Sequence, residues 1–348
     1  MNCTISYNNV CLHDFGYALP PNVVTSAALE ERLGPVYRRL KLPAGRLELM
    51  SGIRSRRFWN PGTRPSQGAA LAGEKALAAA AVERQEIGCL VFTSVSRDMM
   101  EPATASFVHR SLALPSSCQL FDLSNACLGF LNGMVMVANM IELGQIRAGL
   151  VVASETAEDL VESTINHLLS DQDLTRRSIK PAFASLTIGS GAVAMVLGDR
   201  RLVDTGHYLV GGAIRANTDH NDLCQGGQNS EQGVLMSTNS ELLLEKGVET
   251  AAGCWEDFLA QLEWEPDTID RFFCHQVGRA HAQLLFGRLG LDPAKNFETL
   301  PVLGNVGSVS APITMARGVE EGILSAGQRA ALLGIGSGIN SLMLGVQW

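Results

Sequence analysis

Charged side chains, paired cysteines and long apolar runs are all scarce in this sequence. Only 18% of the 348 residues are charged and the net charge is −8, which argues against a general nucleic-acid binder because phosphate binding needs a basic surface. The eight cysteines include no C-x-x-C pair and no Cys/His cluster with zinc spacing, so neither a zinc site nor a disulfide framework is predicted. No apolar run is long enough to span a membrane, and no N-terminal signal pattern is present. We therefore expect a cytoplasmic protein with reduced thiols.

What the sequence does contain is an alternation of strand-like and helix-like segments. Hydrophobic residues make up 46% of it, which is typical of a well-buried globular protein. The alanine-rich segment 70–83 predicts a helix, and short apolar runs at 89–95, 118–123 and 147–154 predict buried strands. This alternation is typical of a layered α/β fold with a largely parallel sheet.

The two halves of the sequence share landmarks. The segment LTIGSGAVAMVLG at 186–198 is echoed by LGIGSGINSLMLG at 333–345, and each has an IGSG turn between apolar runs. The predicted strand at 89–95 has a counterpart at 270–277. In the same way, SNACLGF corresponds in position to LGNVGSVS at 303–310, because each stands just before an apolar helix. These pairs indicate a duplicated fold.

The duplication also predicts where the two halves meet. The two IGSG segments lie closer together in the sequence than the other paired landmarks do, which indicates an insertion in the first half. The polar, irregular stretch 164–183 is the candidate for that insertion. We predict an N-terminal half at 1–200 and a C-terminal half at 201–348.

Cys127 stands in the stretch SNACLGFLNG, between a predicted strand and a long apolar helix. If Ser124 or Asn125 caps that helix, which runs to about position 144, Cys127 lies in its first turn. The free N–H groups and the dipole there would lower the pKa of the thiol. The helix is apolar on nearly all sides and should be central, with Gly129 and Gly133 admitting a close neighbouring helix. A free cysteine can equally be a buried, inert packing residue.

Two further residues can act together with Cys127. His275 ends a predicted strand, where α/β proteins collect their site residues, although a lone histidine at such a position is more often a satisfied core residue. Asn305 lies between glycines, which usually indicates a turn. In the duplicated plan, however, Asn305 occupies in the second half the position that Cys127 occupies in the first. A pseudo-twofold axis would therefore bring these residues together around one cavity.

Taken together, these motifs resemble the thiolase superfamily, and within it the condensing enzymes related to ketoacyl-acyl-carrier-protein synthase III. The resemblance spans nearly the whole chain. It implies a thiolase-like duplicated five-layer α-β-α-β-α fold, a homodimer, and chemistry without a metal or redox cofactor. The segments that carry it are SNACLGF around Cys127, HQV at His275, GNVGSVSAP around Asn305, GIGSGIN at 334–340 and SGIRSRRFW at 51–59.

A closer resemblance is to the OleA family of that superfamily, which joins two fatty acyl-CoA molecules head to head. It rests on TSVSRDMMEPATAS at 93–106, NACLGFLNGM and HQVGRAH. Synthase III usually continues from His-Gln into Ala-Asn, whereas Val277 and Gly278 stand here. The resemblance assigns to Glu101 the removal of an α-proton, a step that a decarboxylating synthase does not need. From the residues alone, Glu101 would instead cap the helix predicted in ATASFVHRSL.

The resemblance also implies which residue carries out each step of a Claisen condensation. The Cys127 thiolate attacks an acyl thioester to form an acyl-enzyme, and the oxyanion binds the backbone N–H groups of Cys127 and Ser337. His275 and Asn305 hydrogen-bond the thioester oxygen of a second acyl-CoA and stabilise its enolate. Glu101 takes the α-proton, and it is expected to do so in the pocket of the neighbouring subunit.

Basic residues are expected beside the site because CoA carries phosphates. Only one or two of the available arginines should touch the ligand, since most arginines are solvated surface. The candidates are Arg279, Arg56 and Arg57, with Arg38 and Arg39 next.

Three other interpretations stay open. A decarboxylating synthase III would use malonyl-acyl carrier protein, and Glu101 and the missing Ala-Asn count against it. A catalytically silent partner subunit would usually have lost the nucleophile, yet Cys127 is present with His275 and Asn305. A thioester hydrolase on the same scaffold would resolve the acyl-cysteine with water.

Overall fold

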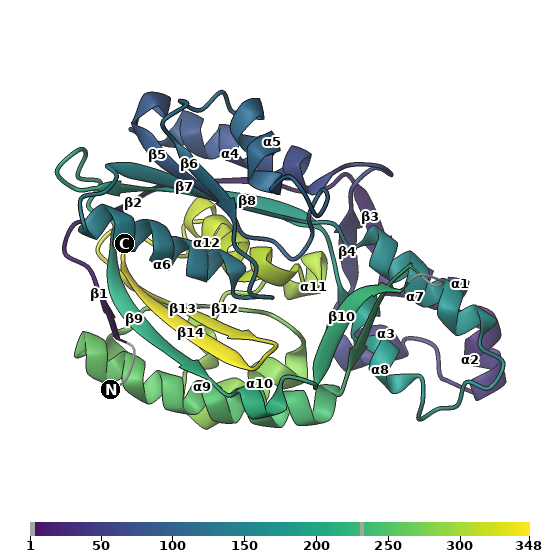
Figure 1. Ribbon diagram of the computed structural model, residues 1–348. Helices are drawn as coiled ribbons and strands as arrows, with labels where there is room; N and C mark the ends of the chain where they lie inside the picture. The colour runs from purple at the N-terminus through teal and green to yellow at the C-terminus, as the bar shows by residue number, and fades with distance from the viewer. Residues whose placement is uncertain (1–3, 230–232) are drawn as a thin grey trace.

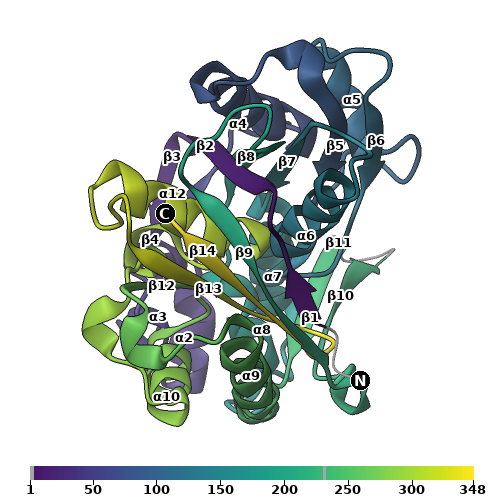
Figure 2. The same cartoon turned by 90° about the vertical axis from the view of Figure 1, so that its left-hand side faces the viewer.

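The computed structural model describes residues 4–229 and 233–348. They form five layers: two sheet layers enclose a layer of helices, and further helices cover the outer side of each sheet (Figures 1 and 2). The expected α/β layering is therefore present.

The first sheet layer has the strand order β2-β8-β7-β5-β6. Strand β5 runs parallel to β6 and β7, whereas β8 is antiparallel to both β7 and β2. All residues of β7 and β8 are buried, because helices cover both faces of the sheet. The strands are β2 (Val10–Ala18), β5 (Ile87–Phe92), β6 (Gln119–Asp122), β7 (Ala148–Glu155) and β8 (Gly191–Asp199).

The second sheet layer repeats this plan. In the order β12-β13-β14-β9, the first pair is parallel and the next two pairs are antiparallel, as in β5-β7-β8-β2. Strand β1 adds to the free edge of β9, and the two layers join through the single pair Cys11–Tyr208. These strands are β1 (Thr4–Ser6), β9 (Tyr208–Ala216), β12 (Arg271–Cys274), β13 (Arg329–Gly336) and β14 (Asn340–Gln347).

Two expectations about the sheets have different outcomes. The prediction of a largely parallel sheet is wrong, because most neighbouring pairs are antiparallel; β13 and β14, for example, are joined by a tight turn that forces the chain to reverse. The boundary predicted near residue 200 falls between β8 and β9. The division into two halves stays a prediction.

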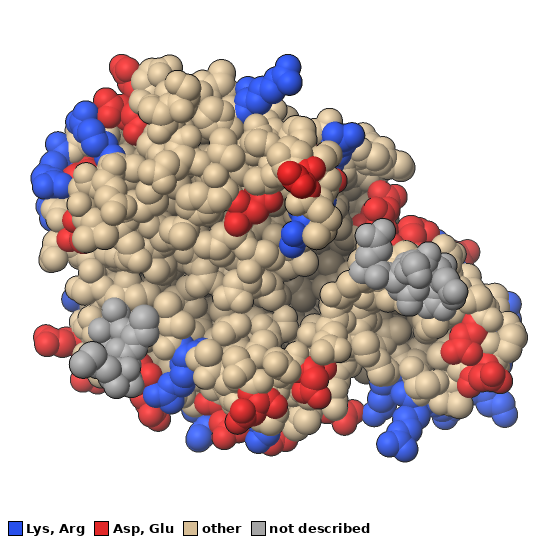
Figure 3. All heavy atoms as spheres, in the orientation of Figure 1, with Lys and Arg blue, Asp and Glu red and all other residues tan. Residues whose placement is uncertain are grey.

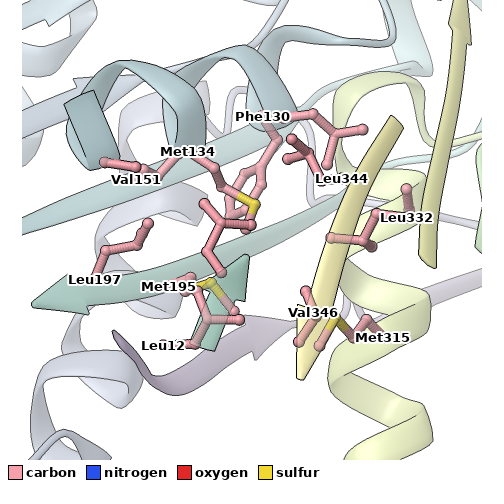
Figure 4. Close-up of a cluster of buried hydrophobic side chains, with 14 of the residues drawn as sticks. Leu12, Phe130, Met134, Val151, Met195, Leu197, Met315, Leu332, Leu344 and Val346 are labelled. Atoms are coloured by element: carbon pink, nitrogen blue, oxygen red, sulfur yellow. The ribbon is translucent and has the colours of Figure 1, made fainter. Parts of the chain in front are cut away.

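The central helix layer is α6 (Gly129–Glu142) and α12 (Ser310–Glu320). Figure 4 shows Phe130 and Met134 of α6 and Met315 of α12 between side chains of both sheets, such as Leu197 and Leu332. Each fully buried side chain of this size contributes roughly 1.5–3 kcal/mol to folding. The outer helices are α4 (Pro65–Ala79) and α5 (Thr104–Ser111) over the first sheet, and α9 (Ser240–Leu262) and α10 (Arg279–Leu289) over the second.

A smaller lobe projects to one side of the layers (Figure 1). It includes α1 (Ser26–Arg32), α2 (Gly34–Leu40), α3 (Arg46–Ser51), α7 (Glu158–Ser170), α8 (Lys180–Phe183) and the hairpin β3 (Asn22–Thr25) with β4 (Ser55–Phe58). The predicted irregular insertion at 164–183 is thus helical at both ends. Its composition hid this, because Ile165, Leu168 and Ile179 are buried in the core of the lobe while most of its polar residues are exposed.

A second hairpin, β10 (Cys224–Asn229) with β11 (Gly233–Thr238), lies beside this lobe. Within the described ranges, no helix combines the length and apolar character needed to cross a bilayer. The seven cysteines of these ranges are free thiols, and Cys3 lies outside them.

Candidate active site

Cys127 lies between β6 and α6, but not inside the helix. Helix α6 begins at Gly129 after Leu128, and no side chain caps it. The prediction that Ser124 or Asn125 caps the helix and places Cys127 in its first turn is therefore wrong. Cys127 lies near the end of the loop after β6, two residues before the first residue of α6.

The loop turns sharply at the residue before Cys127. Ala126 has φ +46°, in the left-handed region that non-glycine residues adopt only when their surroundings impose it. The side chain of Asn125 holds the loop, because its Nδ2 donates to Asn132 Oδ1 at 2.9 Å. The turn therefore presents Cys127 in a fixed direction beside the first turn of α6.

The thiol of Cys127 is neutral in the free protein. Burial raises its pKa to about 12, and the Glu155 carboxylate and Cys224 act in the same direction. The predicted lowering of this pKa is thus wrong: removal from water outweighs the favourable end of a helix that begins two residues later. Acylation therefore requires the proton of Cys127 to leave as the substrate binds.

Gly129 and Gly133 allow α6 to lie close to a sheet, not to another helix as predicted. A Cβ atom on Gly129 would lie 2.1 Å from the carbonyl oxygen of Thr93, and one on Gly133 would lie 2.6 Å from the Thr93 methyl group. Larger residues would push α6 away from the end of β5, and Cys127 with it.

The turn between β13 and β14, which contains Ser337, lies against Cys127. A Cβ atom on Gly336 would lie 3.7 Å from the backbone nitrogen of Cys127. Asn340 connects the two loops, because its Nδ2 lies 3.3 Å from both Asn125 Oδ1 and the carbonyl oxygen of Ser337. The predicted oxyanion residues therefore come from adjacent backbone segments.

Asn305 is buried in the loop between α11 (Leu300–Leu303) and α12. Its backbone N–H donates to Thr187 O at 3.0 Å, and its carbonyl accepts from Gly189 N at 2.8 Å. The side-chain Oδ1 accepts from Gly307 N at 3.0 Å, which leaves the amide NH₂ group as a donor for a ligand. The first IGSG segment thus holds Asn305, as the second lies against Cys127.

His275 follows β12 and is 4% exposed. Its backbone N–H donates to Leu333 O of β13 at 2.8 Å. His275 therefore lies beyond the carboxyl ends of β12 and β13, on the same side of the molecule as the Ser337 turn. Within the described part of the chain its Nδ1 is buried without a hydrogen-bond partner. Burial, and then the neighbouring His281, lower the pKa of His275 to about 3. The imidazole is therefore neutral.

Gln276 ties His275 to the segment that leads to Asn305. Its Oε1 accepts from the backbone N–H groups of Thr299 at 2.9 Å and Leu300 at 2.7 Å, and α11 continues from there to Asn305. Backbone contacts thus hold the loops that carry Cys127, His275 and Asn305 close to the ends of strands in both sheet layers. Direct contact among the three side chains stays a prediction.

The buried neutral state of His275 predicts a pH effect on stability. Its pKa is about 6.5 when unfolded and lower when folded, so the unfolded chain binds the proton first and stability is lost as pH falls from about 6.5 toward 3. His275→Gln should reduce the slope of unfolding free energy against pH in this window by up to about 1.4 kcal/mol per pH unit. Chemical denaturation between pH 4 and 7 checks this, with His167→Gln of α7 as control. Equal slopes in wild type and His275→Gln would contradict it.

Glu101 is exposed in the loop between β5 and α5. The alternative that it caps α5 is wrong, because Asp122 takes that role: its carboxylate accepts from Thr104 N and Ala105 N, both at 2.8 Å. Within the described residues Glu101 makes no hydrogen bond or ion pair. Its carboxylate is therefore free to contact a substrate or another chain.

The predicted CoA-binding arginines differ in accessibility. Arg56 is fully buried and donates to Ser26 Oγ at 3.1 Å; burial lowers its pKa to about 10. The role of Arg56 in binding CoA stays a prediction, and its burial makes it less accessible to a phosphate than the exposed candidates. Arg57 is half-buried and donates to Pro20 O. The exposed candidates are Arg279 at the start of α10, and Arg38 and Arg39 of α2.

Glu155 is a site residue that the sequence interpretation missed. It is 6% exposed at the end of β7 and acts on the Cys127 thiol. The signal available in the sequence was the carboxylate at the end of the largely apolar strand segment AGLVVASE, since α/β proteins collect site residues at strand ends.

Comparison with known proteins gives a consistent result over the whole chain. The family models for 3-oxoacyl-[acyl-carrier-protein] synthase III and for its C-terminal part match residues 121–212 and 259–348. The acyl-CoA:acyl-CoA alkyltransferase of Shewanella oneidensis is 41% identical over 99% of this chain and 100% of its own length. The protein of the same description from Xanthomonas campestris pv. campestris is 38% identical over 98% and 99%.

A solved structure agrees with these relatives. The cerulenin-bound Xanthomonas campestris OleA superposes with a TM-score of 0.94 at 38% identity, covering 99% of this chain and 98% of that one. Other structures of that protein have a cysteine, a histidine or a glutamate replaced, and one contains lauric acid and lauroyl-CoA. The expected thiolase-like fold is thereby confirmed.

Proposed function

Because the chain belongs to the family of acyl-CoA:acyl-CoA alkyltransferases, we propose that it joins two fatty acyl-CoA thioesters by Claisen condensation. The product is a β-keto compound, and the intermediate is an acyl group on Cys127. The observation that carries the proposal is the identity of 41% and 38% to two such enzymes along essentially the full chain. The position of Cys127 between a sharp turn and the Ser337 turn supports it.

The first half-reaction is acylation of Cys127. Its thiol attacks the thioester carbon, and the backbone N–H groups of Cys127 and Ser337 stabilise the oxyanion. The neutral imidazole of His275 has a free lone pair to accept the thiol proton. The departing CoA thiolate then takes that proton, so His275 is neutral again for the second half-reaction.

The second half-reaction makes and uses an enolate. His275 and the amide NH₂ group of Asn305 donate hydrogen bonds to the thioester oxygen of the second acyl-CoA. Glu101 removes the α-proton, and the carbanion attacks the carbonyl carbon of the acyl-cysteine. The acyl–sulfur bond then breaks, the Cys127 thiolate leaves and regains a proton, and the product is a β-ketoacyl-CoA. The replaced glutamate and cysteine of the solved Xanthomonas campestris OleA structures are separated by the same number of residues as Glu101 and Cys127, which supports these two assignments.

In a homodimer, Glu101 of one copy would reach the active site of the other copy. Strand β6 is the open edge of the first sheet layer, and beside it Phe121, Val135 and Met136 line a shallow apolar groove between β6 and α6. The face of the molecule over these elements is largely uncharged (Figure 3). We infer that a second copy covers this edge, because an exposed sheet edge with apolar flanks favours pairing.

The loop that carries Glu101 leads into α5, whose first residues donate to Asp122 at the end of β6, so the loop ends beside this edge. Its tip exposes Met99 and Met100, the latter 86% exposed, while Asp98 anchors it by accepting from the N–H and hydroxyl groups of Ser66. An anchored loop with an apolar tip is suited to insertion into a partner. The carboxylate of Glu101 would then enter the site of that partner.

CoA is the expected carrier of the acyl chains, as in the lauroyl-CoA complex of the solved relative. Arg279 begins α10 four residues after His275 and is exposed, so it is the best-placed candidate for a CoA phosphate. Figure 3 shows a hollow between the layered body and the side lobe, and we propose it as the entry for a long substrate.

One incubation tests the proposed function against its alternatives. Purified protein with a long-chain acyl-CoA alone should release one CoA per condensation and yield a β-ketoacyl-CoA that contains two acyl groups. Hydrolysis of its thioester gives the β-keto acid and the second CoA, and loss of CO2 from that acid gives the ketone. A decarboxylating synthase gives no such product without malonyl-acyl carrier protein, a hydrolase gives only the free fatty acid, and a silent partner subunit gives neither. CoA release without any β-keto product would overturn the proposal.

A further inference from the structure

The carboxylate of Glu155 connects two loops that carry different parts of the site. Its Oε2 accepts from the backbone N–H of Ser96 at 3.0 Å and from the Ser96 hydroxyl at 2.8 Å. Its Oε1 accepts from Val95 N at 3.1 Å and from the Ser308 hydroxyl at 2.7 Å. Val95 and Ser96 lie near the start of the loop that leads from β5 to Glu101.

The second loop closes tightly on the same carboxylate. Ser308 N lies 3.4 Å from Glu155 Oε1, and the preceding Gly307 has φ +54°. A Cβ atom on Gly307 would lie 3.1 Å from Oε1. Because Gly307 also donates to Asn305 Oδ1, the position of Glu155 fixes the backbone that orients the Asn305 side chain.

The donors to Glu155 are all neutral N–H or O–H groups. Within residues 4–229 and 233–348 the structure records no ion pair for this carboxylate, and its side chain lies inside the protein. A buried charge held only by neutral donors keeps both loops in place, because losing any donor leaves the charge poorly solvated. Such a residue restrains geometry more strongly than a packing residue of the same size.

We propose that Glu155 is a positioning residue that sets the Glu101 loop and the Asn305 loop together around Cys127. This inference rests on the proposed function for the roles of those three residues. Within the described residues, the hydrogen bonds of the Glu155 carboxylate go to Val95, Ser96 and Ser308 and not to Cys127. Glu155 acts on the second half-reaction, which needs the base and the enolate donors at one carbon, more than on acylation.

The substitution Glu155→Gln keeps the size and removes the charge, and it replaces one acceptor by an NH₂ group facing N–H donors. Condensation should fall about tenfold to a hundredfold, since small displacements of catalytic groups have effects of this size. The matched control is Glu142→Gln, because the Glu142 carboxylate also accepts from neutral donors, at Asn8 and Asn9, but lies at the far end of α6.

The pH dependence of Cys127 alkylation distinguishes this role from a merely structural one. The Glu155 charge disfavours the thiolate, so Glu155→Gln should shift the midpoint of alkylation by iodoacetamide to lower pH, read from the Cys127 peptide by mass spectrometry. Glu142→Gln should leave it unchanged. This readout needs no acyl-CoA, so it holds even if wild-type protein does not condense acyl-CoA.

Milder variants keep the test decisive if Glu155→Gln fails to fold. Ser96→Ala and Ser308→Ala each remove one hydroxyl donor from one loop and leave the charge in place. Each should reduce condensation several-fold without moving the alkylation midpoint. Wild-type condensation in both serine variants, or an unchanged midpoint in folded Glu155→Gln, would overturn the proposal.

Discussion

Replacing Cys127 with alanine is expected to abolish acyl-enzyme formation and condensation. A nucleophile that forms a covalent intermediate has no substitute in the mechanism, and its removal typically lowers turnover on the order of 10⁶-fold. The fold should persist, because the thiol is lost from a loop and not from the helix interior. We expect a loss of stability of about 1 kcal/mol, as for a small buried group.

Mass spectrometry after incubation with a long-chain acyl-CoA measures the effect directly. Wild-type protein should gain one acyl mass on the Cys127 peptide, and Cys127→Ala should gain none. The control is Cys118→Ala, which removes a buried thiol near the outer face of the first sheet. CoA turnover by a folded Cys127→Ala protein would show that the nucleophile is another residue.

The elements around the site were predictable because their apolar runs are strong. The segments predicted as strands at 118–123 and 147–154 are β6 and β7, and the counterpart strands at 89–95 and 270–277 are β5 and β12, each parallel to its neighbour. The helix predicted at 70–83 begins earlier, at Pro65, because proline is accepted in the first helical turn.

The electrostatics of the site could not be predicted in the same way. The pKa of Cys127 depends on how much water the fold removes and on Glu155, which is 28 positions away. From the local sequence only the helix after Cys127 could be predicted. That helix begins at Gly129, two residues after Cys127, so it does not lower the pKa of the thiol as expected. Likewise, the complete burial of Arg56 could not be predicted from the sequence, because arginine is mostly found exposed.

The hydrogen-bond partners of Glu155 were hidden for a related reason. They come from the loop after β5 and from the loop before α12, which meet only because two duplicated sheets stack on shared helices. A carboxylate at the end of a buried strand is visible in the sequence, but the donors that hold it are not.

Glu101→Gln is expected to separate the two half-reactions. Cys127 should still be acylated, because acylation uses no base on the α-carbon, whereas condensation should fall by about 10²–10⁴-fold, the usual contribution of a general base. Deuterium exchange at the α-carbon of bound acyl-CoA measures the same step and should be lost with it. Glu256→Gln, an exposed glutamate of α9, is the control. Normal condensation by Glu101→Gln would remove the base assignment and favour a decarboxylating reaction.

The exposed position of Glu101 leads to a stronger expectation for mixed dimers. Neither Glu101→Gln nor Cys127→Ala should condense acyl-CoA alone. In a mixed dimer, one of the two sites would combine the intact Cys127 of one chain with the intact Glu101 of the other, so activity should return to at most about half that of wild type, because only one site per mixed dimer is complete. Differently tagged chains, co-expressed and purified through both tags, provide the mixed dimer without relying on subunit exchange. If the doubly tagged dimer is pure and inactive, Glu101 does not act across the interface, and its apolar loop tip must be assigned another role.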